Sequence, residues 1–376
     1  MAVRQNNSIP LSLTHLIDSL NLAGTQTALV HLARGLARRG YRQRVYCLNN
    51  RTHPRVLRQL DEAGVEVIVI GKAQLLSGVG LLRLYRGLRG CQVVQTFLPV
   101  ADVVGRTLAR LARVPVVVTS IRARNVDKRG WQLWLDRLTM RWAHRVVFNA
   151  RNVVDFAVAR EGVRPDQVVV IPNGVRVAGP RPGDVPRARY RVPDGVRVVG
   201  TVGRLRPQKG IGTLLEAFPR VRDRVPAQLW IIGEGPLRAE LEAEARRLGI
   251  AGSVRFWGER SDVPELLACM DVYAHAALFE GMPNAVMEAM AAGLPVVASE
   301  VDGTRELIRE GETGWLVPPG EAAALAARLL AVLDDAEEAA RVGQAAARHM
   351  AENFSVEKMV DAFDALYQDL TGFQNL

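Results

Sequence analysis

The sequence predicts an α/β protein with two domains, each built on a parallel sheet of the Rossmann-like kind. Both halves alternate short apolar strands with amphipathic helices, and several strands run directly into loops that contain glycine. Residues 176–195 between the halves are rich in proline and glycine and lack apolar periodicity, which is typical of a linker. We therefore expect one domain over residues 1–175, a linker over 176–195, and a second domain from residue 196.

Composition indicates a soluble globular protein with anionic partners. Of the 376 residues 48% are apolar and 23% charged, and the net charge is +10 with a pI near 10.1. Nucleic acid, nucleotide diphosphates and anionic membrane surfaces would all suit this charge. The three cysteines show no CxxC spacing, which favours a reducing cytoplasm over disulfides or a metal site. The N-terminus lacks the apolar core of a signal peptide and no segment is long enough to span a bilayer, so any membrane contact should be peripheral.

The chain opens with a βαβ pattern. Residues 12–17 form the predicted first strand, 18–24 a loop, 25–39 an amphipathic helix and 43–48 the second strand. The loop lies at the carboxyl end of its strand, where α/β sheets bind ligands.

Three further features of the first half are candidates for contact with a substrate or membrane. The basic segment 81–89 is either a helix that rests on anionic lipid or a helix with a solvated basic face. The strand 116–119 delivers Arg122 to the edge of the sheet, where a guanidinium could bind a diphosphate or an anionic acceptor, although it could also be an ordinary surface arginine. Residues 129–144 carry Trp131, Trp134 and Trp142 at helical spacing, for which a place in the helix core is favoured over an acceptor or membrane wall.

In the second half, the strand 196–202 runs into the loop GRLRPQKG, residues 203–210. Arg204 and Lys209 place two cations in a loop bounded by Gly203 and Gly210, which suits a diphosphate. The strand 271–276 contains His275 within an apolar run, which favours a packed strand residue over a catalyst.

The stretch FEGMPNAVMEAMAAGLPVVASEVDG, residues 279–303, is predicted as loop, helix, turn, buried strand and loop. Pro283 suits the first turn of a helix over residues 284–292, and Gly293 and Pro295 end it. Glu280 therefore precedes the helix and Glu288 lies within it, while the free amides near Asn284 form an anion site.

Glu280 and Glu288 resemble the E-x7-E motif of the retaining GT-B glycosyltransferases of family four. The loop with Arg204 and Lys209 and the sequence IPNGV at residues 171–175 resemble further motifs of this family. The resemblance implies two Rossmann-like domains that face each other across a cleft, with residues 196–354 forming the nucleotide-sugar domain and a last helix, 355–376, returning to the N-terminal acceptor-binding domain. It assigns Arg204 and Lys209 to the donor's diphosphate, Glu280 to the donor sugar and Glu288 to the ribose. The other donor-binding residues that it implies are Gly24, Gly203, Gly258, Arg260, Gly281, Met282, Asn284 and Ala285.

The sequence departs from the family pattern in the first domain. Ala23 replaces the first glycine of the opening loop and the acidic residue that usually follows is absent, which leaves Gly24 to approach the diphosphate or to serve as an ordinary turn glycine. No histidine occurs between His53 and His144, although many relatives place one at the edge where Arg122 lies.

We therefore expect a retaining glycosyltransferase that acts in the cytoplasm, with peripheral contact to the inner face of the membrane as an option. A UDP-sugar is the favoured donor and GDP-mannose the alternative, and the acceptor is a hydroxyl of a lipid-linked or cell-surface glycan. No convincing DxD motif is present, so we expect no metal and no cofactor, and nucleic acid is not an expected partner. A non-catalytic glycan-binding protein, a sugar-nucleotide epimerase and a phosphorylase remain alternatives on the same fold, and an oxidoreductase is disfavoured because GxGxxG is absent from the first loop.

Overall fold

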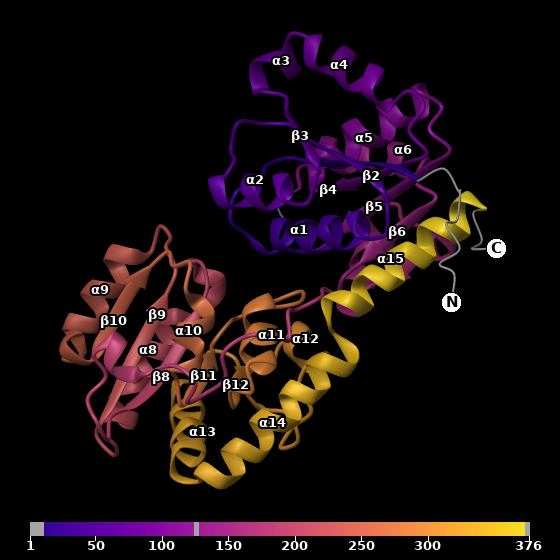
Figure 1. Ribbon diagram of the computed structural model, residues 1–376. Coiled ribbons are helices and arrows are strands. Elements are labelled where there is room, and N and C mark those ends of the chain that lie inside the picture. The colour runs from indigo at the N-terminus through magenta and orange to yellow at the C-terminus, as the bar shows by residue number, and fades with distance from the viewer. Residues whose placement is uncertain (1–10, 124–127, 373–376) are drawn as a thin grey trace, which may run out of the picture. The chain divides into compact units, whose positions relative to one another are not determined.

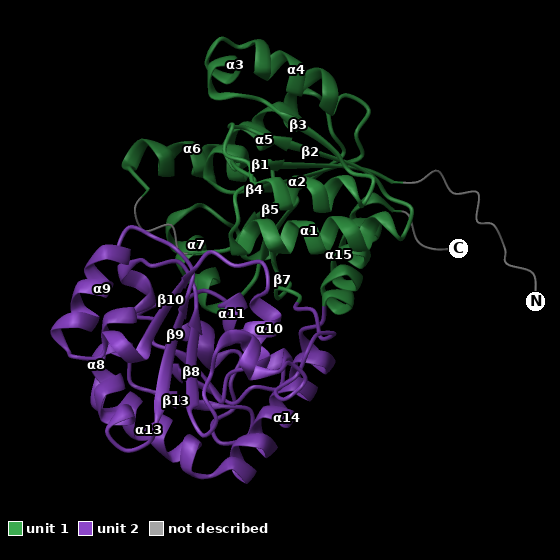
Figure 2. Cartoon of the chain, turned by 60° about the vertical axis from the view of Figure 1, so that its left-hand side comes forward, with its two compact units in different colours: residues 1–174, 356–376 green, residues 175–355 purple. Residues whose placement is uncertain are grey.

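The computed structural model describes residues 11–123 and 128–372 and divides the chain into two compact units (Figure 2). Unit 1 consists of residues 1–174 and 356–376, and unit 2 of residues 175–355. Each unit contains one sheet in which all the strand pairs are parallel, so the α/β class is confirmed.

Unit 1 is built on a seven-stranded sheet with the order β3-β2-β1-β4-β5-β6-β7. The order reverses between β1 and β4, and the loops after these two strands diverge at the carboxyl edge, which is where open α/β sheets bind ligands. The strands are β1 (Ser12–Ile17), β2 (Arg42–Cys47), β3 (Glu66–Val69), β4 (Val93–Phe97), β5 (Val116–Ile121), β6 (Arg145–Phe148) and β7 (Val168–Val170).

Helices cover both faces of this sheet because successive strand residues point to opposite sides. In β1, Leu13 and Ile17 pack into the core under α1, whereas Leu16 packs into the core under α4 and α5. The helices are α1 (Gly24–Ala37), α2 (Pro54–Asp61), α3 (Lys72–Leu76), α4 (Val79–Leu88), α5 (Pro99–Leu111), α6 (Gly130–Met140), α7 (Val154–Arg160) and α15 (Val356–Thr371).

The last helix, α15, belongs to the core of unit 1 although it follows the whole of unit 2 in sequence (Figure 1). Phe363 and Tyr367 are fully buried, and the Tyr367 hydroxyl donates to Gln95 Oε1 at 2.5 Å. Gly35 of α1 packs against Val360, where a Cβ atom would collide with the valine side chain. Glycine at this position therefore lets α15 lie close to α1.

Unit 2 is built on a six-stranded sheet with the order β10-β9-β8-β11-β12-β13 around its own apolar core. Its strands are β8 (Arg197–Val202), β9 (Ala227–Ile232), β10 (Val254–Gly258), β11 (Val272–His275), β12 (Val296–Ser299) and β13 (Trp315–Val317). Its helices are α8 (Ile211–Arg222), α9 (Arg238–Arg247), α10 (Val263–Ala268), α11 (Asn284–Ala291), α12 (Asp302–Arg305), α13 (Ala322–Asp334) and α14 (Ala336–Asn353).

The prediction that residues 176–195 belong to neither domain is wrong, because they are part of unit 2. Val185, Tyr190 and Val192 are buried, and the Tyr190 ring makes edge contacts with Trp230 and Trp257. Proline and glycine shape this segment, but its few apolar side chains anchor it to the sheet.

Two sequence predictions on helices of unit 1 also need correction. Helix α6 ends at Met140, so Trp142 lies beyond it, and Trp131 and Trp134 are 60% and 63% exposed instead of buried in the helix core. Helices α2 and α5 were missed, although Pro54 and Pro99 stand at their first positions, a known signal for a helix start.

Candidate functional site

In unit 2, the loops that follow β8 and β11 carry the predicted donor-binding residues. These strands are neighbours although they are not consecutive, so the strand order reverses here. Ligands bind at such a switch point in open α/β sheets. Topology thus brings Arg204 and Lys209 to the same edge as Glu280.

The loop after β8 is held against β11 by backbone contacts. Gly210 has φ +58°, and a Cβ atom there would collide with the carbonyl of Ala276 at the end of β11. The amide of Leu278 donates to the Gln208 carbonyl at 2.9 Å. Only glycine fits Gly210's conformation and clearance without strain, so the glycine that closes the GRLRPQKG loop fixes its position beside the Glu280 loop.

Lys209 and Glu280 form an ion pair. Lys209 Nζ donates to Glu280 Oε1 at 2.5 Å, and the carboxylate side chain is only 9% exposed. Gln208 Nε2 donates to the Phe279 carbonyl at 3.0 Å and contacts Glu280 Oε2 at 3.5 Å. Glu280 is therefore fixed by two side chains of the preceding motif, and Gln208 is a site residue that sequence analysis missed although it adjoins Lys209.

His275 lies beside the same carboxylate. It is buried in β11 as predicted, but its Nε2 is 3.7 Å from Glu280 Oε1 and has no hydrogen-bond partner among the described residues. Burial and the nearby Lys209 charge lower the pKa of His275 to about 3, so the ring is neutral at pH 7. In the sequence His275 stands one residue before the end of an apolar run, and this position alone does not indicate that its ring lies near Glu280.

The second carboxylate of the motif, Glu288, projects from α11 and is partly buried. Burial raises the pKa of the Tyr273 phenol, and the charges of Glu288 and Glu280 raise it further. Both carboxylates thus act on one buried phenol of β11, whose hydroxyl donates to the Val202 carbonyl at 3.2 Å. The spacing of eight residues therefore brings both acids to the switch point.

The loop between Glu280 and α11 is tightly packed from outside. Gly303 lies so close to the backbone of Gly281 that a Cβ atom would collide with its carbonyl, and Met282 is buried. Asn284 and Ala285 form the first turn of α11, which contains no acidic side chain. The amide N–H groups of that turn can donate to a bound anion, and no acidic side chain in the turn competes for them.

Arg204 lies on the exposed side of its loop. Its guanidinium makes no hydrogen bond or ion pair with the described residues, and partial desolvation and the charge of Arg206 lower its pKa. The repulsion from Arg206 is a cost that an anionic ligand would relieve. Arg204 is therefore a cation available for a phosphate, whereas Lys209 is already paired.

The predicted base-pocket residues lie at the end of β10. Gly258 has φ +68° and its carbonyl accepts from the Gly233 amide at 2.8 Å, so backbone contacts shape this corner. Arg260 donates to both carboxylate oxygens of Asp262 at 2.8 and 2.7 Å, and this pairing lowers the pKa of Asp262 to about 2. The Arg260 guanidinium is thus committed to Asp262. Gly203 directly follows β8, its φ is not positive, and a Cβ atom there would make only an ordinary contact with the Lys209 side chain.

In unit 1, Gly24 is the first residue of α1, after the carboxyl end of β1. Its φ is not positive and Ala23 caps the helix without a side-chain bond. Asp18 in the same loop accepts from the amides of Val100 at 3.3 Å and Ala101 at 2.6 Å, so it caps α5. Burial raises the pKa of Asp18 to about 6.

Arg122 directly follows β5 and is a desolvated cation. Its guanidinium donates to Asn173 Oδ1 and lies over the Phe97 ring, 5.5 Å from the centroid. Burial lowers its pKa to about 10, and its Nε has no hydrogen-bond partner among the described residues. No carboxylate within the described part of the chain pairs with it. A partly buried, desolvated arginine without a carboxylate partner among the described residues favours an anionic ligand.

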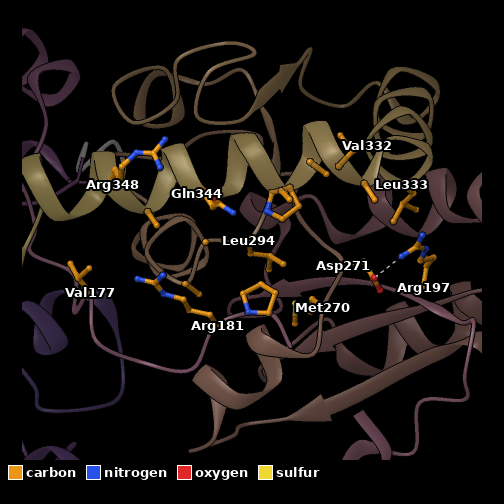
Figure 3. Close-up of a pocket in the computed structure, with 18 of the residues that line it drawn as sticks. Val177, Arg181, Arg197, Met270, Asp271, Leu294, Val332, Leu333, Gln344 and Arg348 are labelled. Atoms are coloured by element: carbon orange, nitrogen blue, oxygen red, sulfur yellow. Dashed lines mark hydrogen bonds and ion pairs between the residues drawn. The ribbon is translucent and has the colours of Figure 1, made fainter. Parts of the chain in front are cut away.

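A separate cavity of about 530 Å³ lies at the opposite ends of the unit 2 strands (Figure 3). Its lining includes Arg197, which begins β8, and Asp271 and Pro295, which precede β11 and β12. Figure 3 shows the ion pair between Arg197 and Asp271 at one end of the cavity and Arg348 of α14 at the other. Because strands of four to six residues are about 13–20 Å long, this cavity is not the site at the carboxyl edge.

Two features are absent from residues 11–123 and 128–372. No described helix combines the length and apolarity needed to cross a bilayer. Within the same ranges, no three or more His, Cys, Asp or Glu side chains gather where they could hold a metal ion.

Two family models match the chain. The model of the glycosyl transferase 4-like domain matches residues 23–174, and that of the glycosyl transferases group 1 matches residues 196–335. Each match lies within one α/β unit. Together they include every predicted site residue.

Curated relatives agree with these matches. A lipopolysaccharide core biosynthesis glycosyltransferase of Rhizobium meliloti is 32% identical over 48% of this chain and 52% of its own length. The chain spans about half the length of the first curated relatives that it matches. An Escherichia coli UDP-Gal:alpha-D-GlcNAc-diphosphoundecaprenol alpha-1,3-galactosyltransferase is 27% identical over 77% of this chain and 79% of its own length.

Solved structures show the same fold. The Anabaena protein HepE, solved with UDP and glucose, superposes with a TM-score of 0.85 at 23% identity and covers 96% of this chain and 100% of its own. A sucrose-phosphate synthase from Thermosynechococcus elongatus gives a TM-score of 0.81 at 20% identity, over 96% and 100% of the two chains. With both family models and this GT-B fold, the chain belongs to the group 1 glycosyltransferases.

Proposed function

We propose that this glycosyltransferase moves a sugar from a UDP-sugar donor to an acceptor hydroxyl with retention of the anomeric configuration. The observation that carries the proposal is the junction of β8 and β11, where Lys209 pairs with the carboxylate of Glu280 and the exposed Arg204 lies in the same loop as Lys209. Cations and carboxylates at one sheet edge match the two halves of a nucleotide sugar, its diphosphate and its diols.

In the transfer, the bond from the anomeric carbon to the β-phosphate breaks and a bond to the acceptor oxygen forms on the same face. The acceptor's proton leaves with the phosphate. Negative charge grows on the diphosphate as the first bond breaks, and Arg204, Lys209 and the α11 amides near Asn284 would stabilise it. Because these groups supply fixed positive charge, we propose that the reaction needs no metal and no cofactor.

Glu280 and Glu288 would bind the rest of the donor. An ionised carboxylate accepts two hydrogen bonds from a diol, so Glu280 would hold the sugar and Glu288 the ribose. The arrangement around Glu280 supports this role, because Lys209 and Gln208 keep its carboxylate in one place before the donor arrives. Gly203, Gly258, Gly281, Met282 and Ala285 would shape the pocket, while the pairing of Arg260 with Asp262 leaves its backbone to contact the base.

The similar proteins and Arg122 support our proposals for the donor base and the acceptor. The titles of the HepE structures name UDP and UDP-glucose, which supports a UDP-sugar over GDP-mannose. The names of the Rhizobium meliloti and Escherichia coli relatives concern lipopolysaccharide core and a diphosphoundecaprenol acceptor, which supports a lipid-linked glycan. Arg122, which pairs with no carboxylate among the described residues, supports an anionic group on that acceptor. A cytoplasmic protein at the membrane surface would encounter such a lipid-linked acceptor.

Two measurements test this proposal. UDP, GDP and ADP are each added while the thermal transition is followed, and we expect UDP to raise Tm most, because a ligand at 100 times its Kd stabilises the native state by about 2.7 kcal/mol. UDP-sugars are then incubated with the protein and release of UDP is measured. If the protein binds UDP but releases no UDP from UDP-sugars, a second candidate is favoured, a non-catalytic binding protein. The altered loop at Ala23 supports this candidate. A shift by GDP alone would contradict the UDP assignment.

A further inference from the structure

The surface formed by α3 and the start of α4 carries three exposed apolar side chains in a row. Leu76, Val79 and Leu82 are 78%, 63% and 49% exposed, at intervals of three residues. Lys72, Arg83 and Arg86 lie on the same two helices and are also exposed. We call these six residues the α3–α4 surface; the two helices lie together at one edge of unit 1 in both views (Figures 1 and 2).

Packing of α4 determines which of its side chains reach this surface. Leu84 and Leu88 are fully buried in the core beneath the helix, and Gly80 lies against Ile70 without room for a Cβ atom. The opposite stripe consists of Val79, Leu82, Arg83 and Arg86, at positions i, i+3, i+4 and i+7. Leu84 and Leu88 therefore belong to the core of unit 1 and not to this stripe.

The charge around this surface is of one sign. The sequence has no Asp or Glu from residue 67 to residue 101, whereas it has Lys72, Arg83, Arg86 and Arg89. Within the described residues Lys72, Arg83 and Arg86 take part in no ion pair. The local charge is therefore not compensated by the protein, and like charge would repel a second copy of the same surface.

We propose that the α3–α4 surface binds the headgroup region of an anionic bilayer. A short apolar row flanked by cations suits an interface, because the apolar side chains enter the acyl boundary while long basic side chains reach the phosphates. Three apolar side chains alone would bind weakly, so both contributions are needed. The inference adds a location to the proposed lipid-linked acceptor, but it concerns binding and not transfer.

Sedimentation with vesicles tests the proposal on the full chain. Vesicles of phosphatidylcholine, with and without phosphatidylglycerol, are compared for the wild type, for Leu76→Ser with Leu82→Ser, and for Arg83→Gln with Arg86→Gln. We expect the wild type to bind only to the anionic vesicles. The affinity for them should fall by about fivefold for each charge removed, and it should fall further in the double serine variant. Higher salt should weaken binding of the wild type and affect the Arg83→Gln/Arg86→Gln variant less.

A matched control uses the end of α5, where Leu111 is 62% exposed next to the exposed Arg110. Arg110→Gln with Leu111→Ser changes the same residue types elsewhere and should bind like the wild type. An equal loss in this control, binding to neutral vesicles alone, or a loss only in Trp131→Ala with Trp134→Ala would overturn the proposal. A wild type that is dimeric and binds no vesicles, together with a monomeric double serine variant, would assign the surface to self-association instead.

The tests keep this inference separate from the proposed function. Each variant is also tested for the UDP-dependent rise in Tm, which depends on unit 2 and should be unchanged. A protein that binds anionic vesicles but not UDP would leave the membrane surface intact and refute the donor assignment. One that binds UDP but no vesicles would do the reverse.

Discussion

His275 Nε2 lies 3.7 Å from Glu280 Oε1, the same oxygen to which Lys209 Nζ donates at 2.5 Å. The carboxylate thus contacts both a cation and a neutral imidazole; the imidazole and the carboxylate are nearly withdrawn from water and the Lys209 side chain is 21% exposed. Low local dielectric strengthens the ion pair and makes any unpaired member costly.

Glu280→Gln should lower the rate of transfer by about a hundredfold to a thousandfold, because it removes the charge that accepts from the donor sugar. The rate of UDP release or of product formation is measured with saturating UDP-sugar. Glu338→Gln, an exposed carboxylate on α14 paired with Arg341, is the control and should be active. A normal rate in Glu280→Gln would refute its assignment.

Lys209→Met should be as damaging as Glu280→Gln, because it also leaves the buried carboxylate without its cation. Affinity for UDP should fall as well, since a charge that faces the diphosphate is lost. Calorimetric titration with UDP measures this fall, and Arg220→Gln on the exposed face of α8 serves as control. If the double variant with Glu280→Gln were exactly as impaired as the sum of the single free-energy losses, the two residues would act independently, contrary to their ion pair.

His275→Gln should make the protein less sensitive to acid. The pKa of His275 is about 3 in the folded protein, well below the ordinary 6.5 of a histidine, so the unfolded state binds the extra proton. Its contribution to stability is complete above pH 6.5 and is lost as the pH falls from 6.5 towards 3, by up to about 1.4 kcal/mol per pH unit. Between pH 6.5 and 5 the free energy of unfolding should fall by roughly 1.5 kcal/mol more in the wild type than in His275→Gln. Denaturant unfolding curves of both proteins at the two pH values measure this difference. An equal change in the free energy of unfolding in both proteins would show that the imidazole does not titrate as stated.

Arg122→Gln should lower transfer by roughly tenfold or more while the affinity for UDP stays unchanged, because Arg122 belongs to unit 1 and the donor loops to unit 2. The kinetic readout is transfer to an anionic lipid-linked acceptor, with UDP release by hydrolysis as the internal reference. Arg110→Gln, on the exposed end of α5, is the matched control. Loss of UDP binding in Arg122→Gln would place its role on the donor side.

Asp102→Asn should stabilise unit 1 at alkaline pH. Burial raises the pKa of Asp102 to about 7 from the ordinary 3.8, and its Oδ1 has no partner among the described residues. The folded state therefore holds the proton, and its stability falls as the pH rises from 3.8 through 7. From pH 5 to pH 8 the variant should gain roughly 3 kcal/mol relative to the wild type.

Differential scanning calorimetry at both pH values checks this gain. Asp166→Asn, a carboxylate on the surface of unit 1, is the control and should show no such pH-dependent gain. A constant difference between Asp102→Asn and wild type would mean that the carboxyl group is ionised in the folded protein.

The sequence by itself determined the α/β class, both donor motifs and the elements on which they lie. Strand patterns, the glycines that end them and the eight-residue interval between Glu280 and Glu288 are local properties, and local chemistry was enough to interpret them. The same local signals misassigned residues 176–195, because proline and glycine mark turns but do not tell whether Tyr190 packs against a sheet.

Only the tertiary structure decided which side chains are partners. The sheet order placed Lys209 beside Glu280 across 71 positions of sequence, and it turned His275 from a packed strand residue into a neighbour of that carboxylate. Packing of α4 likewise decided that Val79 and Leu82 face outwards while Leu84 and Leu88 do not. The physical reason is that pairing and burial depend on which strands and helices become neighbours, and this depends on contacts far apart in the chain.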